Sequence, residues 1–136
     1  MGKYAYFEHD ADIGIEGTGK TVEEAFESAA AALFAIQSDL SEIAPKQKIV
    51  FYFAESDEEF AFVMWLNRLI YEGKNAGLAF CSFKLERRDN LWHGEAEGEP
   101  WSEKMTRGVE VKGATLTCLS VKKKNDIWEA RCIVDV

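Results

Sequence analysis

Hydrophobic and polar residues alternate with two different periods along the first third of the chain. Residues 3–8 and 12–17 have the composition of short strands, separated by a polar stretch. Residues 21–36 instead carry apolar side chains at helical spacing, and Thr21 with Glu24 three positions later forms a capping box. The apolar positions of this helix are Val22, Phe26, Ala29, Leu33 and Ile36. The pattern therefore predicts two strands followed by an amphipathic helix.

A third strand and a second helix follow. Residues 46–54 are rich in β-branched and aromatic side chains, which favour a strand. The next apolar pattern predicts a helix over residues 57–72, with Ser56 as its candidate N-cap. Either Gly73 or Gly77 would end this helix, because glycine readily adopts the left-handed conformation found at helix C-termini.

The rest of the chain is typical of β-structure. Residues 78–87 alternate and predict a strand that pairs with residues 91–98 in a hairpin. Residues 99–107 are irregular, and residues 109–121 and 126–135 predict a second hairpin, with its turn about Lys123, Lys124 and Asn125. In the first hairpin we expect Phe80, Ser82 and Lys84 on one face and Cys81, Phe83 and Leu85 on the other.

The order of these elements predicts an α+β fold, since helices and strands do not alternate regularly. We expect residues 1–136 to form a single domain in which two helices pack on one face of a mixed, mainly antiparallel sheet. The length suits one domain, and a hydrophobic fraction of 47% is enough for a core.

Charge narrows the classes of function. The chain has 24 acidic and 16 basic residues and a net charge of −8. Extensive direct binding to nucleic acid is not expected, because phosphates are usually held by a basic face. A protein partner, a cation or a basic substrate suits this charge better.

Composition also bears on location. The chain has no apolar run long enough for a membrane helix and no signal-peptide core, so we expect a cytoplasmic protein without membrane contact. The three cysteines are far apart and form no CxxC pair, which predicts reduced core thiols rather than a zinc site.

Two regions carry candidate metal ligands. Asp10 and Asp12 are two residues apart, so an extended chain would place both carboxylates on one side, suited to Ca²⁺ or Mg²⁺. An ordinary turn capped by aspartates is the alternative. Asp135 interrupts an apolar terminal strand, and the carboxylate of Val136 would lie beside it. Asp135 is either held by a partner or a cation, or it lies at a frayed, exposed end.

A third candidate group lies nearby in the sequence. Alternation places Glu110 and Lys112 on one face, where either side chain could pair with an opposite charge. A solvated edge strand explains the same pattern.

One nucleotide-binding pattern competes with these candidates. Residues 14–21 match G-x-x-x-x-G-K-[ST] and run from a predicted strand into a predicted helix, as a P-loop does. Such a loop belongs to a parallel, helix-covered sheet with continuous apolar strands. Here the preceding strand contains Asp12 and Gly14, and the later strands look like hairpins. A small nucleotide hydrolase therefore stays as an alternative, together with a chaperone-like protein-binding module.

The chain resembles the archease family over nearly its whole length. The resemblance begins with Phe7-Glu8-His9-Asp10-Ala11-Asp12-Ile13-Gly14, continues through the helix at 21–30, and includes Trp65-Leu66-Asn67-Arg68-Leu69-Ile70-Tyr71, Gly94-Glu95, Glu110-Val111-Lys112 and Val134-Asp135-Val136. The order and spacing of these segments make the match specific. The chain departs from the family at Asp10, Met105, Leu116 and Thr117, where the family often has Thr, His, Tyr and His.

The resemblance implies an accessory protein, not an enzyme, that works with a GTP-dependent RtcB-type RNA ligase in tRNA splicing. It would promote guanylylation of the ligase and so allow repeated turnover. By position, Asp12 and Asp135 match the metal-binding acids of the family and Lys112 matches its functional lysine. The implied cofactor is a divalent cation, calcium first, with magnesium or manganese as alternatives.

Overall fold

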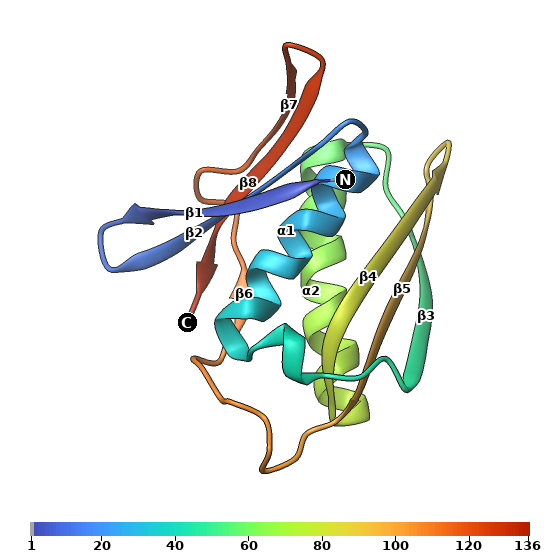
Figure 1. Cartoon of the computed structure of the whole chain (residues 1–136). Coiled ribbons are helices and arrows are strands. Elements are labelled where there is room, and N and C mark those ends of the chain that lie inside the picture. Colours follow the sequence, from blue (N-terminus) through green and yellow to red (C-terminus); the bar gives the residue numbers. More distant parts are fainter. Residues whose placement is uncertain (1) are drawn as a thin grey trace.

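The computed structural model describes residues 2–136 (Figure 1). Its elements follow the chain in the order β1 (Lys3–His9), β2 (Asp12–Gly19), α1 (Val22–Gln37), a 3₁₀ turn η1 (Leu40–Glu42), β3 (Gln47–Ala54), α2 (Glu58–Ala76), β4 (Leu78–Arg88), β5 (Leu91–Pro100), β6 (Gly113–Ala114), β7 (Ser120–Lys124) and β8 (Ile127–Asp135). The α+β prediction is confirmed, as are both helices, the first two strands and the hairpin β4–β5. The structure adds that β1 and β2 pair with each other as a hairpin.

Two antiparallel sheets flank the helices, where we had expected one (Figure 1). The first sheet has the order β1-β2-β8, and both β6 and β7 pair with the far side of β8. The second has the order β3-β5-β4. The reason is the broad buried surface of α1, which packs against β2 on one side and β4 on the other. A helix that is apolar over so much of its circumference must be covered from more than one direction.

Thr21 caps the start of α1 as predicted, because its side chain accepts from the Glu24 amide across 3.1 Å. The Glu24 side chain in turn accepts from the amide of Lys20, one residue before the cap, across 3.2 Å.

Close packing between α1 and β2 depends on small residues. A Cβ at Gly17 would overlap the main-chain oxygen of Ala25 in α1. Glycine therefore lets the strand approach the helix backbone directly.

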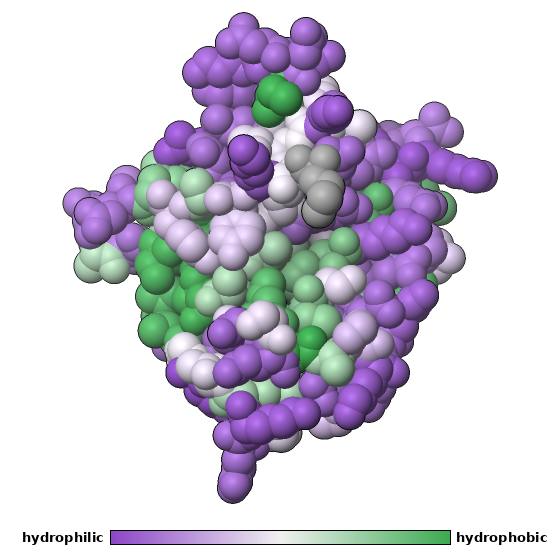
Figure 2. Space-filling view, viewed as in Figure 1, coloured by the Kyte–Doolittle hydropathy of each residue, from purple (hydrophilic) through white to green (hydrophobic). Residues whose placement is uncertain are grey.

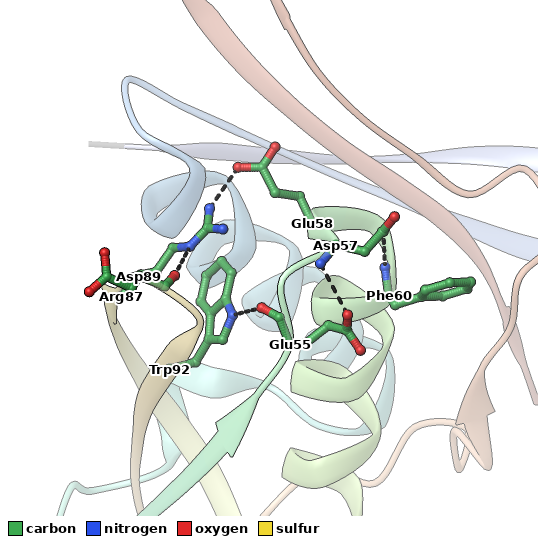
Figure 3. Close-up of polar contacts among 7 residues, drawn as sticks. All are labelled: Glu55, Asp57, Glu58, Phe60, Arg87, Asp89 and Trp92. Carbon is green, nitrogen blue, oxygen red and sulfur yellow. Dashed lines mark hydrogen bonds and ion pairs between the residues drawn. The ribbon is translucent and has the colours of Figure 1, made fainter.

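The start of α2 corrects the predicted cap (Figure 3). Asp57, not Ser56, is the N-cap, and its carboxylate accepts from the Phe60 amide across 3.0 Å. Glu55 in turn accepts from the Asp57 amide across 3.0 Å. The helix runs past the predicted end to Ala76, and Gly77 terminates it with φ of 69°.

The same region attaches α2 to the second sheet (Figure 3). The Arg87 guanidinium donates to the Glu58 carboxylate and to the main-chain oxygen of Asp89, each across 2.8 Å. The guanidinium carbon of Arg87 lies 4.6 Å from the ring centre of Trp92. The indole of Trp92 donates a hydrogen bond to the main-chain oxygen of Glu55 across 2.9 Å. Sheet and helix are thus joined by polar contacts around a buried indole.

The predicted alternation along β4 is wrong across Cys81, since it placed Phe80 on the face of Ser82 and Lys84. Phe80 lies opposite Gly98 and Ser82 lies opposite Glu97, so Cys81 is an extra residue in a β-bulge. Because a bulge shifts every later side chain by one position, Phe80 and Leu85 are both buried on the inner face.

The predicted continuous strand over 109–121 is also wrong, except at residues 113–114 and 120–121. Only β6 and the start of β7 fall within it, since both pair with the single strand β8 and the chain leaves the sheet between them. Thr115 bridges this gap by donating its hydroxyl to the main-chain oxygen of Ile133 across 2.9 Å. The turn lies at Asn125 and Asp126, with φ of 53° and 65°, one residue beyond the predicted centre.

Within residues 2–136, no helix combines the length and the hydrophobicity that crossing a membrane requires.

Candidate functional site

Asp12 and Asp135 come together at one end of the first sheet. The antiparallel pairing of β2 with β8 runs from Gly19 opposite Trp128 to Ile13 opposite Val134. Continued by one step, this register places Asp12 opposite Asp135. Directly opposed residues of an antiparallel pair project from the same face, so the two carboxylates are cross-strand neighbours.

Two further strands reach the same end of the sheet. On β1, His9 lies opposite Asp12. On the other side, Gly113 of β6 lies opposite Asp135, and the Lys112 amide donates to the main-chain oxygen of Asp135 across 2.7 Å. The structure therefore groups Asp12, Asp135 and Lys112, which are far apart in the sequence.

The environment of Asp135 excludes a frayed strand end and shows an exposed carboxylate. Its strand is paired up to this residue, so the end is not frayed. Val134 is fully buried and Val136 packs partly against the core, while Asp135 is exposed on the opposite face. Alternation along the strand thus removes the cost of burying this carboxylate. Asp12 and Lys112 are exposed as well.

Asp10 does not join Asp12 in an extended chain. It lies in the turn between β1 and β2 with φ of 54°, and its carboxylate is 3.9 Å from Nδ1 of His9. The alternative of an ordinary hairpin turn is the correct one for this residue.

With Asp10 in the hairpin turn, Asp12 and Asp135 are the two acids that could bind a metal ion at this end of the sheet. Carboxylate oxygens suit hard cations such as Ca²⁺. In the described part of the chain, no group of three or more His, Cys, Asp or Glu side chains is arranged to hold a metal. Asp12 and Asp135 could therefore supply two side-chain ligands, and the other ligands would be main-chain oxygens, water or groups from a partner.

An open groove of about 740 Å³ lies beneath the β1–β2 hairpin, against the last turns of α1. Its apolar lining includes Ile13, Ala35 and Ile36, and its acidic lining consists of Glu8, Asp10 and Asp12. Figure 2 shows this face of the molecule, with hydrophobic residues gathered at the centre and hydrophilic residues around them. The groove ends at the acidic turn that carries Asp12.

Tyr6 lines the same groove and holds β1 on α1. Its hydroxyl donates to the main-chain oxygen of Ala32 across 2.6 Å. Burial of the hydroxyl, together with nearby Tyr4, raises the pKa of Tyr6 to about 12, so the phenol stays protonated. The sequence did not reveal this groove, although the alternation of Tyr4 and Tyr6 along β1 is a signal that both face one side.

The P-loop alternative is wrong. Residues 14–19 are not a loop, because they form most of β2 and pair with β1 and β8 on either side. The Lys20 amide donates to Glu24 in the capping box of α1. Phosphate binding by backbone amides requires an open loop between strand and helix, which this segment does not provide.

Comparison with known protein families gives a clear match. The model of the Archease protein family matches residues 4–136. The protein archease of Pyrococcus furiosus is 34% identical over 142 residues, and that of Sulfolobus acidocaldarius is 32% identical over 139 residues. Each comparison covers 100% of both chains.

Solved structures have the same fold. The solution structure of Methanobacterium thermoautotrophicum Protein 1598 superposes with a TM-score of 0.80 at 27% identity and covers 98% of both chains. The crystal structure of a Thermotoga maritima archease, described as a possible chaperone, has a TM-score of 0.68 at 23% identity. It covers 96% of this chain and 94% of its own.

Proposed function

Because the chain belongs to the archease family, we propose that it is a metal-binding accessory protein that activates a GTP-dependent RtcB-type RNA ligase. In this proposal the protein is not itself an enzyme. It promotes guanylylation of the ligase, so that the ligase joins tRNA halves repeatedly in the cytoplasm. The observation that carries the proposal is the cross-strand position of Asp12 and Asp135 beside Lys112.

The two carboxylates would hold one divalent cation at the end of the sheet. Calcium is the first candidate, with magnesium and manganese as alternatives, since all three accept oxygen ligands. The carboxylate of Val136 would be a further ligand. A bound cation neutralises phosphate charge, and Lys112, whose amide donates to Asp135, would bring a second positive charge to this end of the sheet. The net charge of −8 would favour docking on a basic ligase surface.

A chaperone-like role is the second candidate, and the groove beneath the β1–β2 hairpin favours it. The groove is partly apolar and open, as a surface that binds protein segments would be. This role predicts binding of client proteins that does not depend on Asp135 or on a divalent cation.

The decisive experiment counts ligase turnovers. The cognate ligase would be mixed with GTP, a divalent metal, excess RNA halves and either wild-type protein or Asp135→Asn. Asp126→Asn is the matched control, because it makes the same charge change at the far end of β8, in a turn with positive φ that asparagine tolerates. Wild type and Asp126→Asn should support many turnovers, and Asp135→Asn should leave the ligase at a single turnover.

Two other results would separate the parts of the proposal. Full activity of Asp135→Asn would exclude the metal site but keep ligase activation. No effect of the wild-type protein would exclude ligase activation, and client binding in the presence of a chelator would then support the chaperone-like role.

A further inference from the structure

A cavity of about 360 Å³ lies beneath the C-terminal ends of α1 and α2. The segment 101–112, which connects β5 to β6 without regular structure, passes below both helix ends and forms the outer wall (Figure 1). A connection of this length is longer than most, and such loops often carry binding sites. The volume falls within the range of small-molecule sites.

The cavity combines apolar walls with a few polar groups. Its apolar walls are Phe34, Ile70, Leu78, Trp101 and Val109. These residues come from α1, α2, β4 and the 101–112 segment, so the cavity exists only in the folded protein. Its charged lining residues are Lys74, Arg107 and Glu110. An apolar pocket with few convergent polar groups is the usual form of a ligand site.

The charge of the lining is opposite to that of the protein. Lys74 and Glu110 form an exposed ion pair at 3.4 Å. The Arg107 guanidinium lies 4.0 Å from the ring centre of Trp101 and, within residues 2–136, forms no ion pair with a carboxylate. The lining therefore keeps one uncompensated positive charge in a chain whose net charge is −8.

Capping of the helix ends does not account for this charge. Cations often stabilise helix C-termini by interacting with free carbonyl groups. Here main-chain amides already satisfy several of those carbonyls. Gly108 donates to Gln37 across 2.8 Å, and Trp101 donates to Gly77 across 3.3 Å. The guanidinium of Arg107 is left on an aromatic wall, where it can donate to a ligand.

We propose that this cavity binds a small amphiphilic anion, with a compact aromatic or branched aliphatic body and one carboxylate or phosphate group. The apolar body would lie among Phe34, Ile70 and Trp101, and the anionic group would accept hydrogen bonds from Arg107. The site is separate from Asp12 and Asp135, so the proposal does not depend on metal binding or on ligase activation.

Three probes of nearly equal size and different charge test this proposal. Benzoate, benzyl alcohol and benzylamine would each be titrated into the labelled protein, with the Trp101 indole and the Gly77 and Gly108 amides followed by NMR. Benzoate should give saturable shifts at these positions and bind about tenfold tighter than benzyl alcohol, because its contact with Arg107 is charge-assisted. Benzylamine should bind most weakly.

Two variants give opposite expected changes. Arg107→Gln should abolish the preference for benzoate over benzyl alcohol. Glu110→Gln, at an exposed side chain, should tighten benzoate binding because Lys74 loses its partner. Equal binding of the three probes, absence of saturable shifts with benzoate, or weaker benzoate binding by Glu110→Gln would each overturn the proposal. Asp126→Asn should leave all three affinities unchanged.

Discussion

The indole Nε1 of Trp65 donates a hydrogen bond to the main-chain oxygen of Phe26 across 2.9 Å, and so joins α2 to α1. Both residues are fully buried. The Phe26 ring also stacks on Trp92 of the second sheet, with ring centres 5.4 Å apart. A single buried position thus connects both helices and the β3-β5-β4 sheet.

Trp65→Phe should lower the free energy of unfolding by about 1–3 kcal/mol. The substitution removes the hydrogen bond to Phe26 and leaves unfilled volume in the core. Urea denaturation followed by circular dichroism measures the change. Trp128→Phe, at a partly exposed position on β8, should lower the free energy of unfolding by less. Equal decreases in the two variants would contradict this role for Trp65.

Asp57→Ala should destabilise the protein by about 1 kcal/mol, because it removes the acceptor for the Phe60 amide at the start of α2. Asp57→Asn retains an acceptor and should be close to wild type. Ser56→Ala is the control that distinguishes the observed cap from the one predicted by sequence. Thermal unfolding of the three variants gives the comparison, and a larger effect at Ser56 would show that the cap is assigned wrongly.

Stability should fall in acid partly through Glu99. The Ala44 amide donates to this buried carboxylate across 2.7 Å, and this hydrogen bond, followed by the charges of Lys104 and Lys46, lowers the pKa of Glu99 below its usual 4.5. Because the pKa of Glu99 is lower in the folded state than in the unfolded chain, the ionised carboxylate stabilises the fold at pH values above 4.5. This stabilisation is lost as the pH falls below 4.5 toward the lower folded-state pKa. Glu99→Gln should therefore be less stable than wild type at neutral pH, and the difference should shrink in acid.

Glu27 should show the opposite pH dependence. Burial raises the pKa of its carboxyl above 4.5, although the carboxylate accepts from the Leu85 amide across 2.8 Å. The Glu27 carboxyl therefore binds its proton more tightly in the folded state than in the unfolded chain. Its contribution to the free energy of unfolding falls as the pH rises from 4.5 through the higher folded-state pKa. The stability difference between wild type and Glu27→Gln, measured by denaturation over the same pH range, should change in the direction opposite to that for Glu99→Gln.

The three free cysteines should react with iodoacetamide at different rates. Cys118 is exposed and should react first. Burial raises the pKa of Cys81, and it raises the pKa of the buried Cys132 to about 12, which suppresses the reactive thiolate. Pulse labelling with mass spectrometry should place Cys132 last, and in urea the three rates should converge. Fast labelling of Cys132 in the folded protein would contradict this order.

Calcium binding, if the proposed site is correct, should weaken in both Asp12→Asn and Asp135→Asn. Each substitution removes one negative charge and one oxygen ligand from the pair. Asp10→Asn is the matched control, because this residue lies in the hairpin turn and its side chain is 90% exposed. Titration calorimetry should show wild-type affinity for Asp10→Asn, and equal weakening in all three variants would indicate only a general effect of charge.

Features that depend on local chain preferences were predictable from sequence. The capping box at Thr21 and Glu24 marks the start of α1 correctly, and Gly77 is one of the two glycines predicted to end α2. The bulge at Cys81 was not predictable, because the residue itself favours a strand and the extra position arises from pairing with β5.

The α+β class, the two helices, the hairpin β4–β5 and the resemblance to the archease family could be recognised in the sequence, since periodicity, caps and motif order are local or linear properties. The enclosure of the helices by two sheets and the position of Asp12 across from Asp135 emerged only from the fold. The fold also decided that Arg107 faces a cavity with Lys74 and Trp101. These relationships arise from strand pairing and packing between residues distant in the chain, and no local preference encodes which distant segments will meet.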